Sequence, residues 1–293
     1  MAAYAKAFPF VEVNSTFYEH PDARRVAAWR SRVPVTFRFA IRAHRDVSHR
    51  QRMRATASGR ASFARTARIA HQLKAVAVVV ETPERLRFGP AEVEGLRDLL
   101  SSAELSCPLA LEARAYRGRT LPKGLSAAME ANDVVDIVDF SIQSPRTEAS
   151  IAYGRMFGLG DGNRWEFTAD ELAAIRDRGE ATGTKPVAYT FHGVRMYKDA
   201  GRFLTFMRVG KAPPVTRRVG LKSLEEVLAE AATFPSGKAD LLQEHGFRAV
   251  RPLEEREVHA HDILSRLPQR SFSSPADVIR ALGGFGSPVE SKL

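Results

Sequence analysis

The fold is decided by the stretch Val11-Glu12-Val13-Asn14-Ser15-Thr16-Phe17-Tyr18-Glu19-His20-Pro21. Its first four residues alternate between valine and a polar residue, which is the period of a β-strand, so the two polar side chains share one face. A strand with one apolar face and one face carrying Glu and Asn suits the wall of a barrel, with the polar face pointing inward. Pro21 then ends the extended stretch, and a helix begins behind it.

The composition limits the class of protein. With 293 residues, of which 44% are hydrophobic, the chain can bury one large core, or one core plus a small appendage. A single cysteine, Cys107, excludes an intramolecular disulfide framework and fits a reducing compartment. The longest purely apolar run, residues 75–80, is too short to span a bilayer, and the N-terminus has no export signal. We therefore expect a cytoplasmic protein that does not enter a membrane.

The positive charge is concentrated at one end of the sequence. Residues 1–70 contain fourteen lysines and arginines against four acidic residues, an excess that equals the net charge of +10 for the whole chain. Several of these arginines fall in the arginine loop, residues 48–54. This pattern is typical of a protein with an anionic partner, either a small molecule or nucleic acid. A basic surface that is merely solvated would give the same pattern.

Strands and helices alternate through the first two thirds of the chain. The continuous apolar run at residues 75–80 is typical of a parallel strand buried on both faces. Capping signals and prolines mark helices between the strands. Seven strands are expected, near residues 11, 37, 76, 109, 134, 152 and 187. Such regular alternation predicts an α/β fold of the TIM (β/α) barrel type rather than an open sheet.

Four further segments strengthen this assignment by their order and spacing. They are His71-Gln-Leu-Lys-Ala-Val-Ala-Val-Val-Val-Glu-Thr-Pro83, Leu111-Glu-Ala-Arg114, Ile151-Ala-Tyr-Gly-Arg-Met-Phe-Gly158 and Val194-Arg-Met-Tyr-Lys-Asp-Ala200. Together with the opening stretch, they resemble domain-of-unknown-function family 72, the YecE-like TIM barrels, in its archaeal-type branch. The resemblance extends from Phe10 to about Met207. It implies a TIM barrel with a polar pocket at the C-terminal ends of its strands and no established activity.

The chain departs from the family pattern at two places near the strand ends. Phe157 precedes Gly158 where the family usually has a histidine, and His192-Gly193 stands where asparagines are often found. A phenylalanine neither ligates a metal nor transfers a proton. Any role that this histidine plays elsewhere in the family is therefore in doubt here.

The first strand of the family is also missing from the sequence. Family members usually carry a glycine-rich strand upstream of the opening stretch, and nothing before Phe10 resembles one. We therefore expect that Met1 is an internal or misassigned start, and that the barrel lacks its first strand. The barrel should then be open between the strands near Val11 and Val187, with residues 6–10 poorly held.

The last part of the chain has a different organisation. Residues 1–209 are assigned to the barrel, and residues 210–220, which contain paired prolines and glycines, to a linker. Helix start and stop signals recur through residues 221–293, which we expect to form a small, separable all-α module. The patterns at residues 234–242 and 267–278 resemble domain-of-unknown-function family 2795, a small helical unit whose role the resemblance does not imply.

Active sites of TIM barrels lie at the C-terminal ends of the strands and in the loops that follow. Glu81, Glu112 and Asp139 are expected there and are the candidates for general acid or base catalysis. Further polar residues at the same end are candidates for binding the substrate: Glu12, Asn14, Thr16, Tyr18, Arg42, His44, His49, Arg114, Arg155 and His192. The arginines among them suit an anionic group such as phosphate. The alternative is a mouth filled by ion pairs, for example Glu112 with Arg114 or Glu12 with Arg42.

The sequence does not decide whether a metal ion binds, nor which activity the protein has. A divalent metal ion could bind among several acids and histidines, but none of them belongs to a His-x-His or His-Glu-x-x-His motif. The residues concerned are Glu81, Glu112, Asp139, His44 and His192. One interpretation of the function is a hydrolase-like enzyme that acts on a phosphate-bearing or nucleic-acid substrate. The other is a non-catalytic binder of an anionic ligand or nucleic acid.

Overall fold

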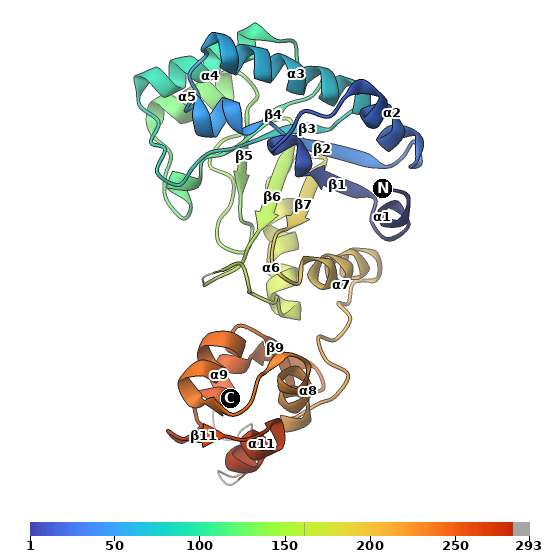
Figure 1. Ribbon diagram of the computed structural model, residues 1–293, viewed down its shortest axis with the longest axis vertical. Helices are drawn as coiled ribbons and strands as arrows, with labels where there is room; N and C mark the ends of the chain where they lie inside the picture. The colour runs from blue at the N-terminus through green and yellow to red at the C-terminus, as the bar shows by residue number, and fades with distance from the viewer. Residues whose placement is uncertain (161, 284–293) are drawn as a thin grey trace. The chain divides into compact units, whose positions relative to one another are not determined.

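A computed structural model describes residues 1–160 and 162–283 of the chain. The chain divides into two compact units, which are described separately (Figure 1). The first unit comprises Met1–Met156 and Asp177–Thr190. The second comprises Phe157–Arg176 and the chain from Phe191 onward.

The first unit is built on a sheet of seven parallel strands that follow one another in chain order. The strands are β1 (Phe10–Val13), β2 (Arg38–Arg42), β3 (Ala77–Glu81), β4 (Leu109–Glu112), β5 (Val135–Val138), β6 (Ala152–Met156) and β7 (Val187–Phe191). All seven predicted strands are present, and the α/β fold of an incomplete TIM barrel is confirmed. β1 and β7 are the two edges, and within the described part of the chain no hydrogen-bonded ladder joins them.

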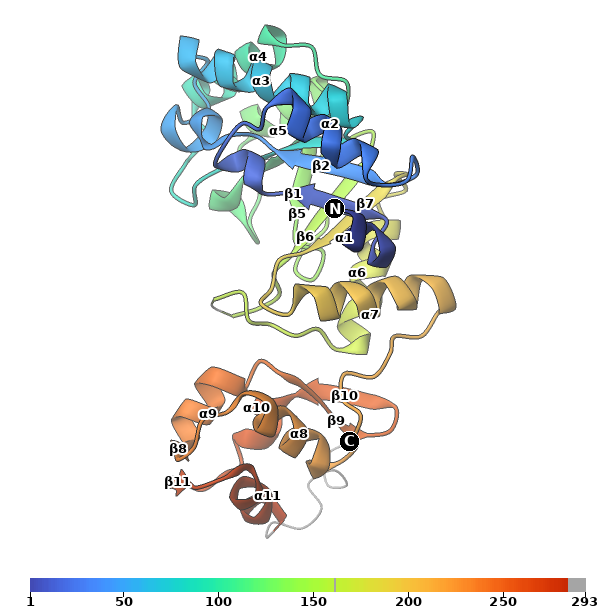
Figure 2. The same ribbon diagram turned by 45° about the vertical axis from the view of Figure 1, so that its right-hand side comes forward.

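Helices separate most of the strands. They are α1 (Ala2–Ala7), α2 (Ala23–Ser31), α3 (Ala57–Leu73), α4 (Pro90–Ser102), α5 (Lys123–Ala131), α6 (Ala169–Glu180) and α7 (Met196–Val209). α2 begins where Asp22 Oδ1 accepts a hydrogen bond from the Arg25 amide (2.8 Å), and α3 begins where Thr56 Oγ1 accepts one from Gly59 (3.1 Å). α3 packs against β2, β3 and its neighbour α4 (Figures 1 and 2).

Side chains that alternate along the strands face two different environments, the helices on one side and the barrel interior on the other. Phe39, Val78 and Leu111 belong to the buried cluster that includes the helices. The interior cluster of the barrel consists of Ala40, Ala77, Val79, Ala110, Val135, Ile137 and Tyr153. Because side chains alternate along a strand, the residues two positions after Ala40, Val79 and Ala110 face the same side as these three. Those residues are Arg42, Glu81 and Glu112.

The segment before β1 is held by definite contacts. Residues 2–7 form α1, and the Tyr4 ring lies edge-on to Phe37 with 6.4 Å between the ring centroids. Tyr4 also contacts Phe8 at 5.0 Å, and Phe10 pairs with Arg38 in the ladder. The expectation that residues 6–10 are poorly held is therefore wrong, because aromatic contacts anchor this segment to the barrel.

The connection between β5 and β6 has no helix among its residues, 139–151, all of which are described. The loop instead folds back onto β5, where Arg146 binds the buried Asp136 through two nitrogens: Nε lies 2.8 Å from Oδ2 and Nη2 lies 2.6 Å from Oδ1. Among the described residues, the β5–β6 ladder joins Ile137 to Tyr153 and Val138 to Gly154. Within this part of the chain the ladder begins late, and the N-terminal ends of the two strands are not paired with each other.

The C-terminal part of the second unit contains helices and short strands. The helices are α8 (Leu221–Ala231), α9 (Lys238–His245), α10 (Ala260–Leu264) and α11 (Pro275–Gly283). Two antiparallel pairs accompany them: β9 (Ala249–Leu253) with β10 (Arg256–His259), and β8 (Ser236–Gly237) with β11 (Ser271–Phe272). The predicted helices are confirmed, but the segment is not all-α, because it contains these two strand pairs. Residues 284–293 of the predicted module lie outside the described residues.

A buried carboxylate connects distant segments within the second unit. Glu166 Oε1 lies 2.6 Å from Lys198 Nζ on α7, and Oε2 lies 2.9 Å from Arg248 Nε just before β9. Oε2 also accepts a hydrogen bond from the Ala249 amide (3.2 Å). Residues assigned to the barrel and residues assigned to the module therefore share a charge cluster. The boundaries at residues 209 and 221, and the independent folding of the module, stay predictions.

Asp199 on α7 lies next to this cluster and is fully buried. Its Oδ1 accepts a hydrogen bond from the Phe167 amide (3.3 Å), whereas Oδ2 has no hydrogen-bond partner among the described residues. Burial and the nearby Glu166 raise the pKa of Asp199 to about 7. Asp199 is therefore a carboxyl group whose ionisation opposes folding.

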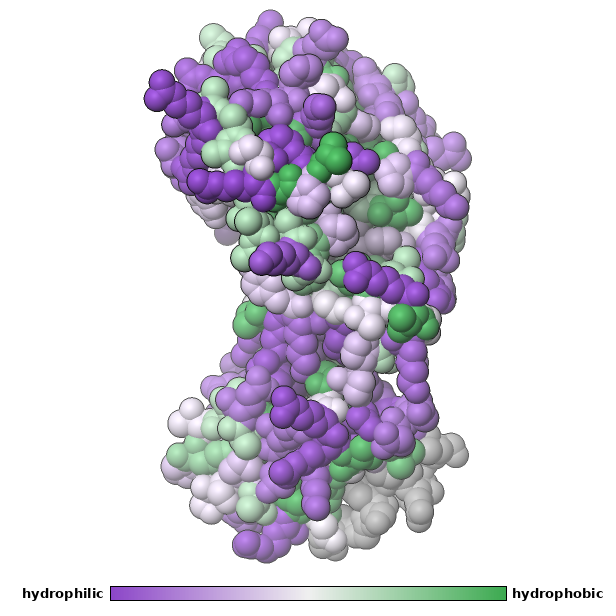
Figure 3. All heavy atoms as spheres, turned by 90° about the vertical axis from the view of Figure 1, so that its right-hand side faces the viewer, coloured by the Kyte–Doolittle hydropathy of each residue, from purple (hydrophilic) through white to green (hydrophobic). Residues whose placement is uncertain are grey.

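Hydrophilic side chains cover most of the face drawn in Figure 3, and hydrophobic ones are scattered among them. Exposed large apolar side chains occur, with Val35 83% and Val194 73% exposed. In the part of the chain that the structure describes, no helix combines the length and the apolar character needed to cross a bilayer.

Candidate functional site

Charged residues gather at the C-terminal ends of the strands in the first unit. Glu81 and Glu112 are the last residues of β3 and β4 and face each other in the ladder. Arg42 is the last residue of β2, and Arg155 lies on β6. The alternation of Leu109 and Leu111 with Glu112 predicts that Glu112 faces the barrel interior, and the structure agrees. Leu111 packs in the helix-facing core, while Glu112 bonds to Arg155 inside the barrel.

Arg155 is the centre of this site, and its side chain is only 3% exposed. Its Nη2 lies 3.2 Å from Glu12 Oε1, and its Nη1 lies 2.8 Å from Glu81 Oε2. Nη1 also donates a hydrogen bond to Glu112 Oε2. One guanidinium therefore joins carboxylates from β1, β3 and β4, and we call these four residues the Arg155 cluster.

Two further arginines bind Glu81. Arg42 Nη2 lies 2.9 Å from Oε2, and Arg114 Nη1 lies 3.4 Å from Oε1. Arg42 is buried, with its guanidinium 4.1 Å from the ring centre of Phe17. The Arg114 side chain is 34% exposed, and its Nη2 also reaches the exposed Glu84 at 2.6 Å. Arg114 is therefore the arginine of the site that a ligand can reach most easily.

Tyr153 holds Glu12 from the interior of the barrel. Its hydroxyl donates a hydrogen bond to Glu12 Oε2 (2.8 Å), and the side chain is completely buried. Burial and the neighbouring Glu12 raise the pKa of Tyr153, so the phenol stays protonated and remains a donor. Because Tyr153 and Arg155 both bind Glu12, this carboxylate is fixed in place.

The two carboxylates at the strand ends differ in their protonation. Burial works to raise the pKa of Glu81, but Arg155 and Arg42 outweigh it and hold the pKa below its ordinary value. Burial raises the pKa of Glu112, and the charge of Glu81 adds to this against the opposing effect of Arg155. The Arg155 guanidinium therefore contacts two carboxyl groups with different preferences: Glu81 favours the ionised form and Glu112 favours the protonated form.

The arginine loop begins inside a π-helix, η2 (Asp46–Arg50), a rare turn that is frequent at functional sites. The His49 ring lies edge-on to Phe17 at 4.9 Å, and its Nδ1 is 3.0 Å from Ser48 Oγ. Burial lowers the pKa of His49, while the charge of Glu81 acts in the opposite direction. His49 is therefore close enough to the Arg155 cluster to feel its charge.

A glycine on α4 fixes the far end of this loop. Met53 is buried with a φ of 64°, and a Cβ atom on Gly95 would lie 2.2 Å from the Met53 carbonyl oxygen. The close approach of loop and helix therefore requires a residue without a side chain at position 95.

Two other predicted site residues, Thr16 and His44, bind backbone carbonyl groups. Thr16 Oγ1 lies within hydrogen-bond distance of the carbonyl oxygens of Val13 (2.9 Å) and Arg42 (2.7 Å), and its one hydrogen is shared between them, which ties β1 to β2. His44 Nε2 contacts the Tyr18 carbonyl oxygen at 3.1 Å, and its Nδ1 lies 3.2 Å from Asp46 Oδ2. Asn14 Oδ1 accepts a long hydrogen bond from Arg42 Nη1 (3.4 Å). The Tyr18 side chain is 62% exposed.

Two predicted residues contact residues outside the Arg155 cluster. Asp139 follows β5, where Arg117 Nη2 lies 2.9 Å from its Oδ2 and Ser141 Oγ donates to its Oδ1 (2.6 Å). His192 belongs to the second unit, where its ring stacks on Phe157 at 5.1 Å.

The carboxylates of the site are arranged around arginines. Among the residues that the structure describes, no three His, Cys, Asp or Glu side chains are placed so that they could hold a metal ion. A divalent ion at Glu81 and Glu112 would have to displace the Arg155 guanidinium first.

Sequence reasoning missed Tyr153, and it placed Phe17 near the mouth without giving it a contact in the site. Tyr153 lies two positions before Arg155 on β6, so the alternation of the strand was a signal that the two share a face. Phe17 gave no comparable signal, because its contacts with Arg42 and His49 join residues that are distant in the sequence.

Comparison with known proteins places the fold in one family. The family described as "Protein of unknown function DUF72" matches residues 1–217. A solved DUF72 family protein from Enterococcus faecalis V583 is 20% identical, with a TM-score of 0.55, over 71% of this chain and 92% of that chain. One from Thermotoga maritima MSB8 is 17% identical, with a TM-score of 0.55, over 69% of this chain and 85% of that chain. No curated protein matches the chain. The likeness of residues 234–278 to family 2795 stays a prediction. The chain belongs to the DUF72 family, whose function is unknown.

Proposed function

We propose that the Arg155 cluster is an acid–base site that hydrolyses a phosphate-bearing substrate. The observation that carries the proposal is the opposite displacement of two neighbouring carboxyl pKa values, with Glu81 lowered and Glu112 raised around one guanidinium. Such a pair supplies an ionised base and a protonated acid at the same pH.

The roles follow from the protonation states. Glu81 would take a proton from a water molecule as the water oxygen attacks phosphorus, and Glu112 would give its proton to the leaving ester oxygen. The P–O bond to the ester oxygen would break as the new P–O bond to the water oxygen forms. The water proton would then be on Glu81 and the Glu112 proton on the released alcohol, and transfer of one proton from Glu81 to Glu112 would restore the site. Arg114, being 34% exposed and already bound to Glu81, would hold the phosphate oxygens, and the basic residues of the arginine loop would attract the substrate.

A non-catalytic anion binder is the second candidate. It is favoured by the charge balance of the site, because each of the three glutamates already has an arginine partner. The occupant would be an anionic small molecule or nucleic acid attracted by the basic residues 1–70.

Hydrolysis assays with aryl phosphate, nucleotides and a short oligonucleotide distinguish these functions. We expect a bell-shaped pH profile for the natural chain. Glu112→Gln should lower kcat by about 10²- to 10⁴-fold and remove the alkaline limb, whereas Glu81→Gln should remove the acidic limb. Arg114→Met should raise KM, with Arg97→Met, an exposed arginine on α4 paired with Glu94, as the control.

Two results would contradict catalysis. Phosphate-dependent stabilisation that Arg114→Met abolishes, without turnover of any substrate, would establish a binder. Absence of both turnover and anion binding would reject both functions.

A further inference from the structure

The loops that follow β2, β3 and β4 at their C-terminal ends are strongly basic. They are residues 43–56, 82–89 and 113–122, and we call them the basic rim. Together they contain nine arginines against two acidic residues, Asp46 and Glu84. The connections that enter the same three strands at the opposite end contain two basic residues and one acidic residue. The positive charge is therefore concentrated at the end of the barrel that holds the Arg155 cluster.

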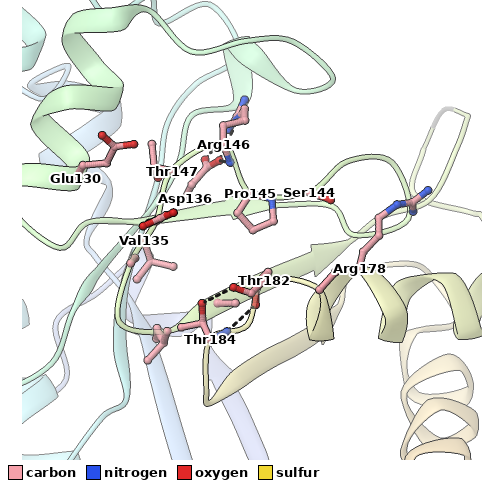
Figure 4. A pocket seen from close by; sticks show the side chains of 15 residues that line it. Glu130, Val135, Asp136, Ser144, Pro145, Arg146, Thr147, Arg178, Thr182 and Thr184 are labelled. Carbon is pink, nitrogen blue, oxygen red and sulfur yellow. Dashed lines mark hydrogen bonds and ion pairs between the residues drawn. The ribbon is translucent and has the colours of Figure 1, made fainter.

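The cavity beside the β5–β6 loop, of about 570 Å³, has a different charge balance (Figure 4). It lies at the N-terminal ends of β5 and β6, since Val135 and Ala152 are among its lining residues. Its charged lining residues are three acids and two arginines: Glu130, Asp136, Glu148, Arg146 and Arg178. A polyanion is therefore attracted to the basic rim rather than to this cavity.

Side-chain contacts join the loops of the basic rim into one surface. Arg114 Nη2, in the loop after β4, lies 2.6 Å from Glu84 Oε1 in the loop after β3. The loop after β2 reaches the beginning of α4, where Arg54 Nη2 lies 3.9 Å from Glu92 Oε1. Because α4 begins directly after the loop that contains Glu84, the basic rim is continuous from β2 to β4.

Several arginines of the basic rim are available to a ligand. Arg52, Arg85 and Arg119 are exposed, and within the described part of the chain their side chains form no ion pair and no hydrogen bond. Each of these residues comes from a different loop of the rim. A guanidinium group without an internal partner can direct all its donors to phosphate oxygens. The rim therefore offers separated phosphate contacts rather than one enclosed anion site.

An exposed aromatic side chain lies beside the basic rim. Tyr18 follows β1 and is 62% exposed. Its ring lies edge-on to Phe17 at 5.0 Å, and Phe17 also contacts His49, in the loop after β2, at 4.9 Å. An exposed aromatic ring provides a face on which an unpaired base of any kind can stack. Tyr18 therefore places a stacking surface next to the arginine loop.

We propose that the basic rim binds single-stranded nucleic acid, with phosphates on the exposed arginines and one unpaired base stacked on Tyr18. The inference rests on the proposed function, because Arg114 of the rim would present one phosphodiester group to the Arg155 cluster. Arginines spread over three loops favour a strand of several nucleotides over a mononucleotide, whose phosphate reaches few of them. The bases of a duplex are paired and stacked on each other, so a duplex cannot use Tyr18 in this way.

The first test measures the salt dependence of oligonucleotide binding to the full chain. The probe is a fluorescein-labelled oligothymidylate of about 12 nucleotides, followed by fluorescence anisotropy. Arg52→Gln, Arg85→Gln and Arg119→Gln, combined in one variant, should weaken binding and reduce the slope of log K against log salt by about 2.

The matched control for this variant removes the same charge outside the rim. It combines Arg24→Gln, Arg32→Gln and Arg68→Gln, at exposed arginines that form no ion pair among the described residues. The control should leave the slope close to that of the natural chain.

The second test concerns the stacking surface. Tyr18→Ala should weaken oligonucleotide binding about 5- to 100-fold without changing the salt slope, because a stacked base is lost and no charge is removed. Tyr18→Phe keeps the ring and should bind nearly as tightly as the natural chain. Melting temperatures followed by circular dichroism establish that both variants are folded.

Several outcomes would overturn the proposal. Equal losses for the rim variant and its control would do so, as would an unchanged affinity of Tyr18→Ala. Equally tight binding of a DNA duplex or of inorganic polyphosphate would also contradict it, since neither offers an unpaired base. Oligonucleotide binding without cleavage would uphold this inference and reject hydrolysis at the Arg155 cluster. Turnover of aryl phosphate without oligonucleotide binding would do the reverse.

Discussion

Each unit buries a cluster of charges, and the two clusters have opposite compositions. In the first unit one arginine, Arg155, faces the carboxylates of Glu12, Glu81 and Glu112. In the second unit one carboxylate, Glu166, faces two cations, Lys198 and Arg248. Both centres are nearly inaccessible to solvent, with Arg155 3% and Glu166 0% exposed.

The difference in composition determines what each cluster can do. Lys198 and Arg248 overcome the effect of burial and lower the pKa of Glu166, so that cluster stays fully ionised and acts as a structural connection. In the Arg155 cluster burial instead raises the pKa of Glu112, although every glutamate of the site has an arginine partner. A carboxyl group that favours the protonated form is therefore the feature that makes the first cluster a candidate for chemistry, whereas the fully ionised second cluster is a candidate for stability.

Removal of Arg155 should have the largest effect on stability. Arg155→Met leaves three buried carboxylates without their common partner and should lower the free energy of unfolding by about 3–5 kcal/mol. Urea denaturation checks this, with Arg97→Met as the control, which should change the value by less than about 0.5 kcal/mol. A change below about 1 kcal/mol for Arg155→Met would mean that the cluster is hydrated rather than buried.

Glu166→Gln should have a smaller effect, although Glu166 is as deeply buried. Lys198 is 36% exposed and can turn to water, and Arg248 keeps Glu230 at 2.7 Å. We therefore expect a loss of about 2–3 kcal/mol at neutral pH in chemical denaturation of the full chain. Because the pKa of Glu166 is lowered in the folded state, the loss should shrink as pH falls through that pKa. An effect larger than that of Arg155→Met would reverse the comparison.

Asp199→Asn should stabilise the second unit. The pKa of Asp199 is about 7 in the folded state, above the ordinary value of 3.8, so stability is highest below 3.8 and declines as pH rises to about 7. Asparagine does not ionise, so the variant should gain about 1–2 kcal/mol at pH 8 and little at pH 4. Melting temperatures at both pH values provide the measurement. A variant that is less stable at pH 8 would show that the ionised carboxylate is needed.

Glu112→Gln should have the smallest effect on stability. Burial favours the protonated form of Glu112, and glutamine resembles that form, so the free energy of unfolding should change by less than about 1 kcal/mol. Glu81→Gln is the matched comparison and should cost more, since Glu81 is held ionised by Arg155, Arg42 and Arg114. Equal losses in urea denaturation would show that the two carboxyl groups do not differ in protonation.

The sequence predicted the strands and the inward face of the site, because both depend on local alternation. Val11 and Val13 against Glu12, and Leu109 and Leu111 against Glu112, define their faces without knowledge of the fold. Contacts between distant residues were harder to predict. The convergence of three glutamates on Arg155, the Glu166 cluster and the cavity at the β5–β6 loop all depend on packing. The helix-free loop at residues 139–151 gave no periodic signal to mark its return to Asp136.

The gap between the edge strands β1 and β7 has a consequence for motion. Among the residues that the structure describes, β1 is joined to the sheet by a ladder on one side only, where it pairs with β2. Glu12 reaches from β1 to Tyr153 and Arg155 on β6, so these side-chain bonds reinforce the edge. Any ligand that drew Arg155 away from Glu12 would let β1 open more often. Amide hydrogen exchange at residues 11–13 would then become faster. The exchange rate of this edge strand would therefore report the binding of such a ligand at the barrel mouth.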